Sequence, residues 1–259
     1  MNAMIAATAK VKAMNAKLLA ADDYATLSKM ESETEVIEWL RAKDYSKNIE
    51  QSAIHICKYI TDKNQRSYIK EMAATKKETL HYYTAQWKRL SLMDSKNRTA
   101  LRSILGQEID LNNILWMYRL KKYHRIKGDA TYGYLIPIRY KLNRQSTGRM
   151  ADSQNPKALM EEVAQGPYAS VFAKLVNSNK GSMDNEPIGM GSIPNSSFHP
   201  SLEQMLRFSP EHMLAITIEG FCQTIARRYP TTLAVVVLYL YKRKMEASRI
   251  TAILNSQKG

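Results

Sequence analysis

Residues 101–117 read LRSILGQEIDLNNILWM, and their apolar side chains recur at intervals of three and four residues. This spacing places them on one face of an α-helix, and the same periodicity runs through most of the chain. Gly is 10 and Pro is 8 among 259 residues, both low counts, while good helix formers are plentiful. The sequence therefore predicts an all-α fold, in which this long helix ends near Gly128.

Other helices are predicted outward from this one. Ser32 and Glu35 form a capping box, which marks a helix start. The apolar run Leu233–Tyr241 is about half of the roughly 20 residues that span a bilayer, so it predicts a helix buried on all sides. A Gly/Pro-rich loop is expected at about 177–200. Periodic stretches predict further helices at about 11–19, 49–60, 68–92, 156–163, 168–176, 202–208, 210–229 and 231–254.

An internal repeat is the most informative feature of the chain. With a shift of 123 residues, SETEVIEWLRAKDYSKNI (32–49) overlays NPKALMEEVAQGPYASVF (155–172). The same shift places Leu19 on Leu142 and Tyr45 on Tyr168.

A second shift, of 136 residues, overlays LGQEIDLNNIL (105–115) on YKRKMEASRIT (241–251), with Asp110 on Glu246. The order of the matches is the same in both copies. We therefore expect two related helical-bundle lobes, 1–130 and 131–259, that leave a concave face between them.

The charge of the chain indicates an acidic partner. Lys and Arg number 38 against 24 Asp and Glu, so the formal net charge is +14. Nucleic acid, an anionic membrane surface and an acidic protein all attract such a chain. The excess is spread over both halves, which favours a solvated, Lys-rich helical surface over a basic arm.

Targeting and redox signals are weak. Cys57 and Cys222 lie far apart among apolar neighbours, which is typical of a reducing compartment. Lys10, Lys12 and Lys17 interrupt the apolar N-terminal stretch, so we expect no signal peptide. We also expect no membrane-spanning segment.

No motif predicts a catalytic, cofactor or metal site. The chain has no GxxxxGK[ST], no HExxH and no CxxC, and its five histidines are scattered. The glycines of PIGMGSIP (187–194) follow no predicted strand, so they indicate a loop. An enzyme whose active site is dispersed along the chain is one alternative.

Nucleic-acid binding is the other alternative. The basic and aromatic stretch 116–127 could follow a nucleic-acid backbone on a helix. Its cations also lie in the last turns before Gly128, where the helix dipole favours them, and its aromatic residues lie on one apolar face. The second interpretation, a helix C-terminus, is the one we adopt.

Four stretches carry a resemblance to a known family. They are VKAMNAKLLAADDYATL (11–27), ETEVIEWLRAKDY (33–45), QEIDLNNILWMYRLKKY (107–123) and the C-terminal segment 209–254. The chain resembles the family of C subunits of V-type and A-type ATPases, whose eukaryotic members are called d subunits. Typical prokaryotic members are longer and have three helical repeats, whereas two are found here.

The resemblance implies a non-catalytic, funnel-like helical adaptor in the central rotor of a V/A-type rotary ATPase. Such an adaptor is peripheral on the cytoplasmic face of the membrane. It joins the central-stalk subunits to the membrane proteolipid ring and passes torque for proton or other ion transport, with no cofactor and no small-molecule substrate. Packed helices suit this task because packed interiors transmit strain.

Two sets of residues are expected to serve this role. Asp110, Asn113, Glu246 and Arg249 lie at matched positions of the repeat, and we expect them to bridge helices within each lobe. The partner contacts are expected among basic residues at helix ends, which suit acidic partner surfaces. These residues are Arg119, Lys121, Lys122, Arg125, Arg227 and Arg228.

Overall fold

The computed structural model describes residues 3–43, 45, 48–74, 80–172 and 210–257, and every regular element in these ranges is helical. The all-α prediction is confirmed. The predicted loop at about 177–200 and the predicted helix at about 202–208 lie outside the described residues. None of the described helices combines the length and the apolar character that crossing a membrane requires.

The chain divides into two compact units, and each of the two points at which it passes from one unit to the other falls within a helix. Unit 1 is Met1–Leu105 together with Ala215–Gly259, and unit 2 is Gly106–Leu214. Unit 1 is thus built from both ends of the chain. Its borders differ from the expected border at 130/131. That the two halves form related lobes, and that they make a funnel, stay predictions.

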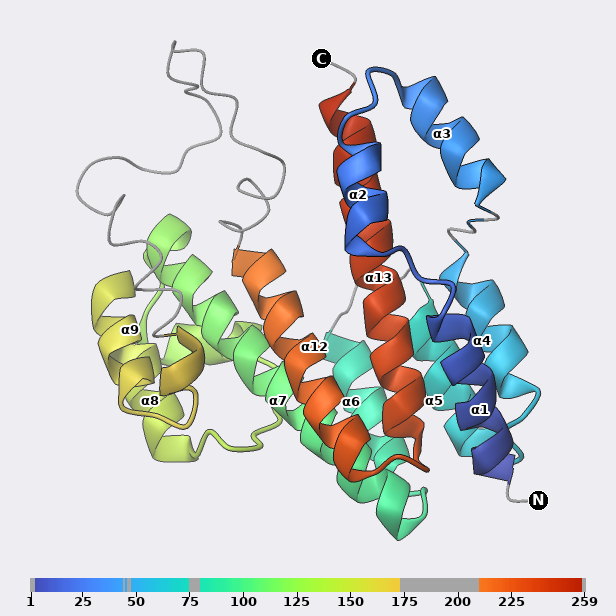
Figure 1. Cartoon of the computed structure of the whole chain (residues 1–259). Coiled ribbons are helices and arrows are strands. Elements are labelled where there is room, and N and C mark those ends of the chain that lie inside the picture. Colours follow the sequence, from blue (N-terminus) through green and yellow to red (C-terminus); the bar gives the residue numbers. More distant parts are fainter. Residues whose placement is uncertain (1–2, 44, 46–47, 75–79, 173–209, 258–259) are drawn as a thin grey trace. The chain divides into compact units, whose positions relative to one another are not determined.

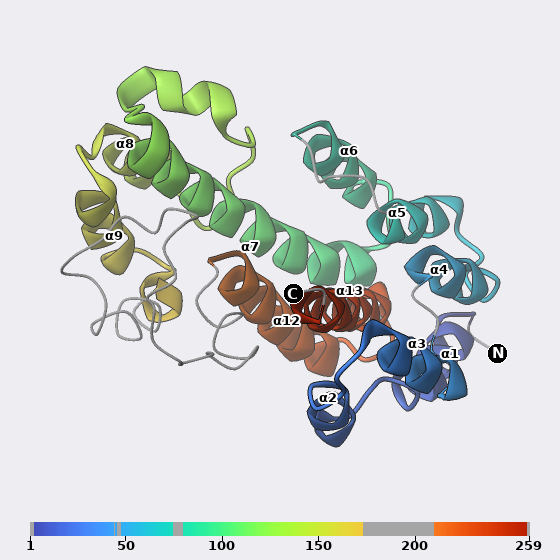
Figure 2. The same cartoon turned by 90° about the horizontal axis from the view of Figure 1, so that it is seen from above.

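Unit 1 is organised around the last helix of the chain, α13 (Leu233–Ser256), which packs against α1, α4 and α5 (Figures 1 and 2). Leu233, Val237 and Leu240 are fully buried, whereas Val235 and Leu238 are only partly buried, so the helix predicted at 233–241 is largely buried but not on all sides. The other helices of this unit are α1 (Ala3–Asn15), α2 (Ala21–Leu27), α3 (Glu33–Ala42), α4 (Ile49–Cys57), α5 (Lys63–Ala73), α6 (Leu80–Leu90), the first part of α7 (Ser95–Arg119) and most of α12 (Pro210–Arg228).

Unit 2 contains the remainder of α7 and a pair of short helices, α8 (Arg144–Asp152) and α9 (Pro156–Ala164), that pack against each other. After Arg119 the long helix continues as a π-helical turn, η1 (Leu120–His124). It ends at Arg125, which has a left-handed conformation with φ 54°. The predicted end at Gly128 is therefore three residues too late, because Gly128 begins the 3₁₀ turn η2 (Gly128–Tyr134).

The helix starts follow the repeat. Ser32 caps α3 by accepting the N–H of Glu35 at 3.2 Å, and Asn155 caps α9 by accepting the N–H of Ala158 at 2.9 Å. Ser32 and Asn155 are separated by the 123-residue shift, as are the first residues of α2 and α8. Ser32 is confirmed as the N-cap of α3, but the capping box is incomplete, because the Glu35 carboxylate accepts the N–H of Glu31 at 3.1 Å and not that of Ser32. Capping residues at matched positions start matched helices in the two units.

Candidate functional site

A buried carboxylate on α7 holds a connecting segment in unit 2. Asp110 accepts hydrogen bonds from the N–H groups of Tyr140 at 3.1 Å, Lys141 at 2.7 Å and Leu142 at 3.1 Å. The hydroxyl of Tyr168 donates a fourth, at 2.8 Å. Burial raises the pKa of Asp110 above its ordinary value, and the backbone N–H groups act in the opposite direction. This carboxylate fixes the segment 135–143, which joins η2 to α8.

Asn113 holds the other end of the same segment. Its side-chain amide donates to the carbonyl of Ile136 at 3.1 Å and accepts the N–H of Ile136 at 2.8 Å. A nearby glycine completes the attachment: a Cβ placed on Gly106 would lie 2.3 Å from Cγ of Tyr140. The Tyr140 ring thus packs directly on the backbone of α7.

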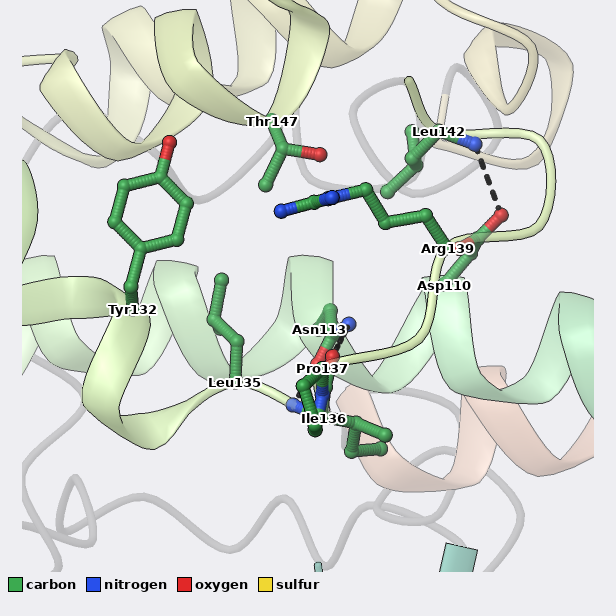
Figure 3. A pocket seen from close by; sticks show the side chains of 9 residues that line it. All are labelled: Asp110, Asn113, Tyr132, Leu135, Ile136, Pro137, Arg139, Leu142 and Thr147. Atoms are coloured by element: carbon green, nitrogen blue, oxygen red, sulfur yellow. Dashed lines mark hydrogen bonds between the residues drawn. The ribbon is translucent and has the colours of Figure 1, made fainter. Parts of the chain in front are cut away.

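A cavity of about 170 Å³ lies beside these contacts (Figure 3). It is lined by Asp110, Asn113, Tyr132, Leu135, Ile136, Pro137, Arg139, Leu142 and Thr147. In Figure 3, α7 lies below the cavity, the helix that carries Thr147 lies above it, and the connecting segment runs along its right-hand side from Pro137 to Leu142.

Unit 1 has a corresponding carboxylate on α13. Glu246 accepts the N–H of Leu19 at 2.7 Å and forms an ion pair with Arg243. The guanidinium of Arg243 lies 4.9 Å from the ring centre of Tyr45. Burial raises the pKa of Glu246, whereas the hydrogen bond from Leu19 and the charge of Arg243 act against this shift. Glu246 thus joins α13 to the segment between α1 and α2.

One turn further along α13, the guanidinium of Arg249 lies 5.3 Å from the ring centre of Tyr24. Burial and the charge of Glu246 raise the pKa of Tyr24 to about 12. A cavity of about 340 Å³ adjoins these groups. It is lined by Asn15, Leu18, Leu19, Tyr24, Glu219, Lys242, Met245, Glu246 and Arg249.

We call each buried carboxylate, together with the connecting segment whose N–H groups it binds, a carboxylate clamp. One clamp is Asp110 with the segment 135–143, and the other is Glu246 with the segment between α1 and α2. The two clamps occupy matched positions of the repeat. Leu142 donates to Asp110 and Leu19 donates to Glu246, and the shifts found in the sequence relate the two donors and the two acceptors. The linings of the two cavities also share four matched pairs. These pairs are Asp110 with Glu246, Asn113 with Arg249, Leu142 with Leu19, and Thr147 with Tyr24. The contacts agree with the internal repeat.

The clamps differ in the origin of the cation beside the tyrosine. In unit 2, Nζ of Lys141 comes from the connecting segment and lies 5.9 Å from the ring centre of Tyr168. In unit 1, Arg243 comes from α13 itself. Each clamp therefore combines a buried carboxylate, a backbone N–H, a tyrosine and a cation. The connecting segment supplies the cation in unit 2, whereas the helix that carries the carboxylate supplies it in unit 1.

The expectation that these polar residues bridge helices within each predicted lobe is wrong for Asp110 and Glu246. Both carboxylates bind connecting segments, and the backbone donors of these segments lie beyond the expected border at 130/131. The reason is that a buried carboxylate is satisfied by unpaired backbone N–H groups, which connecting segments offer and helix interiors do not.

The basic residues predicted as partner contacts divide between the units. Arg119, Lys122 and Arg125 lie at the end of the long helix in unit 2, and Arg227 and Arg228 lie exposed in the last turn of α12 in unit 1. Arg125 is exposed, and Nζ of Lys122 lies 5.4 Å from the ring centre of Tyr123.

Lys121 differs from its neighbours. Only 4% of the residue is exposed, and its ammonium group donates to the carbonyls of Ala151 at 2.7 Å and Ser153 at 2.8 Å. It caps the C-terminal end of α8, where a cation is favoured. We therefore remove Lys121 from the proposed contact surface.

The chemistry of the two clamps is structural. Their carboxylates are buried and already hydrogen-bonded, so they hold backbone segments in place. Among the described residues, no group of three or more His, Cys, Asp or Glu is arranged to hold a metal ion. Sequence reasoning identified the acidic members of the clamps and matched Leu19 with Leu142. It missed that these two residues donate to the carboxylates, because a backbone donor has no side-chain signature.

Comparison with known proteins identifies one family. The model of the family described as ATP synthase (C/AC39) subunit matches residues 71–258. No curated protein and no solved structure gives a match. The matched range contains both clamp carboxylates, Asp110 and Glu246.

Proposed function

This chain belongs to the ATP synthase (C/AC39) subunit family, and from that premise we propose that it is the non-catalytic rotor adaptor of a V/A-type rotary ATPase. In this role it joins the central stalk to the membrane proteolipid ring, at the cytoplasmic face of the membrane, and transmits torque for ion transport. The family match over residues 71–258 is the observation that carries the proposal.

The clamps support a mechanical role. A protein that transmits torque must resist deformation, and each clamp ties a connecting segment to a long helix through a buried, hydrogen-bonded carboxylate. In unit 1, the clamp also joins the segment before α2 to α13, near the other end of the chain. Force applied to either segment therefore passes into packed helices.

The charge of the helix ends supports acidic protein partners. Arg227 and Arg228 end α12, and Arg119, Lys122 and Arg125 end the long helix of unit 2. We propose these five residues as contacts to central-stalk subunits or to the loops of the proteolipid ring.

The proposal is tested by removing the chain from cells that contain the ATPase. ATP hydrolysis by the catalytic head should persist, while ATP-driven ion transport into membrane vesicles should fall to background. The wild-type chain should restore transport, and a tagged copy should co-purify with the stalk and the ring. Unchanged transport without the chain contradicts the proposal, as does isolation of the chain with nucleic acid, released by salt, in place of other ATPase components.

A charge-reversal pair tests the contact residues. Arg227→Glu combined with Arg228→Glu should weaken co-purification with the stalk and reduce transport. Lys12→Glu combined with Lys29→Glu is the matched control, because both lysines are exposed in the same unit and the change in charge is identical. Equal effects of the two pairs would remove the α12 end from the contact surface.

A further inference from the structure

Unit 2 contains a second cavity, which the predicted contact residues do not line. It has a volume of about 370 Å³ and is lined by Asp129, Tyr132, Arg139 and Arg144. Asp129 and Tyr132 belong to η2, Arg139 to the connecting segment, and Arg144 is the first residue of α8. Figure 3 shows the side chain of Arg139 extended toward Tyr132 and Thr147.

The backbone that carries the two arginines is held from both sides. Asn113 binds Ile136, and Asp110 binds the N–H of Tyr140, the residue after Arg139. Asp110 also binds the N–H of Leu142, two residues before Arg144. The arginines are therefore presented from fixed positions, which reduces the entropy that a ligand must overcome on binding.

The positive charge of this cavity is not neutralised within the described part of the chain. Arg139 and Arg144 are exposed, and neither makes an ion pair or a hydrogen bond with another described side chain. Asp129 is the one acidic residue in the lining, against two guanidinium groups. The N-terminal end of α8, which begins at Arg144, adds a partial positive charge.

We propose that this cavity binds the carboxylate side chain of an acidic segment in a protein partner. The planar guanidinium groups of Arg139 and Arg144 match the two oxygens of a carboxylate. The ring of Tyr132, 37% exposed, offers apolar surface to the methylene groups of the partner's side chain. Asp129 selects against phosphate, because its charge repels a dianion more strongly than a carboxylate.

The inference rests on the proposed function only for the identity of the partner as a component of the ATPase. The cavity and its charges belong to this chain alone, so binding can be measured on the purified full-length protein. A peptide with three consecutive glutamates is a suitable probe, and inorganic phosphate is the probe for the competing ligand.

Nitrogen-15 NMR of the arginine side chains gives a direct readout. The peptide should shift the Nε–H signals of Arg139 and Arg144, and its affinity should fall as salt is added. Arg139→Gln and Arg144→Gln should each weaken binding by roughly tenfold, the equivalent of one charged hydrogen bond. Lys157→Gln removes the same charge from an exposed position in the same unit and should leave binding unchanged.

Two results would overturn the inference. One is that phosphate shifts both arginine signals and the peptide shifts neither. The other is that the two arginine variants bind the peptide as tightly as Lys157→Gln. Denaturant unfolding of each variant is the control for folding. Because both arginines are exposed, the variants should be as stable as the wild type.

The failure of this inference can be separated from the failure of the proposed function. If deletion of the chain abolishes ATP-driven transport but Arg139→Gln with Arg144→Gln preserves it, the adaptor role stands and this cavity does not bind another part of the ATPase. If the peptide binds as expected but transport does not depend on the chain, the site stands and the adaptor role fails.

Discussion

Glu246 accepts a hydrogen bond from the backbone N–H of Leu19 at 2.7 Å, across a separation of 227 residues in the chain. This contact joins the segment before α2 to the last helix, and so links the N-terminal and C-terminal parts of unit 1. In unit 2, Asp110 makes the matching contact to Leu142, 32 residues away. The repeat therefore places one clamp within a continuous stretch of chain and the other between segments near its two ends.

Glu246→Ala should lower the free energy of unfolding by about 3–5 kcal/mol, because it leaves the guanidinium of Arg243 buried without its carboxylate. Chemical denaturation measures this loss. Glu219→Ala is the matched control: Glu219 lines the same cavity but is only partly buried, so its effect should stay within about 0.5 kcal/mol. Equal losses for the two variants would contradict the clamp.

Tyr168→Phe should lower the free energy of unfolding by about 1.5–3 kcal/mol, since its hydroxyl donates to the buried carboxylate of Asp110. A double-mutant cycle with Asp110→Ala should give a coupling energy above about 0.5 kcal/mol. Tyr59→Phe, at a residue 41% exposed, serves as the control. Additive effects of the Tyr168 and Asp110 changes would rule out the hydrogen bond as a source of stability.

Gly106→Ala should destabilise the protein by about 1–3 kcal/mol, because the new Cβ would lie 2.3 Å from Cγ of Tyr140. Gly220→Ala changes another helical glycine that has no neighbouring atom within 4 Å of the new Cβ. That variant should be more stable than the wild type by about 0.5–1 kcal/mol, since alanine favours the helix. Thermal unfolding distinguishes the two, and stabilisation by both would show that Tyr140 does not need the glycine.

Lys121→Met should cost about 1–3 kcal/mol of stability, because two carbonyl groups at the end of α8 lose their donor. Lys121→Met should weaken partner binding only as far as the loss of stability unfolds the protein. Arg125→Met changes an exposed residue nearby, so its effects on stability and on stalk binding are compared with those of Lys121→Met. A Lys121 variant of normal stability that fails to bind the stalk would restore this lysine to the contact surface.

Asp94 should make stability depend on pH. It caps α7 by accepting the N–H of Asn97 at 3.1 Å. Burial raises the pKa of Asp94, but hydrogen bonds from Asn97 and neighbouring N–H groups outweigh this effect, so the pKa is lowered from its ordinary value of 3.8. The folded state thus favours the ionised form, and its stabilisation is present above pH 3.8 and lost as the pH falls through the lowered pKa.

Asp94→Ala should therefore cost about 1 kcal/mol near neutral pH, and the difference from the wild type should shrink in acid. Urea unfolding from pH 7 down to about 2 follows the difference. A constant gap over the whole range would mean that the charge of Asp94 contributes nothing. Asp22→Ala is the control, because Asp22 is an exposed residue in the first turn of α2.

The sequence by itself determined the helical class, most helix positions and the matched starts of α3 and α9. These features follow from periodicity and capping, which depend on residues within a few positions of one another. The matching of Asp110 with Glu246, and of Leu19 with Leu142, was also visible in the two shifts.

Only the tertiary structure decided which groups these residues bind. The partners of Asp110 and Glu246 include backbone N–H groups of connecting segments, and any residue except proline carries such a group. The burial of Lys121 against the end of α8, and the attachment to α7 of the segment that carries Arg139, likewise depend on how distant segments pack. Helix positions and caps depend on which residue types follow one another locally, so they can be predicted from the sequence. Which distant segments pair depends on their arrangement in space, which the residue types do not specify.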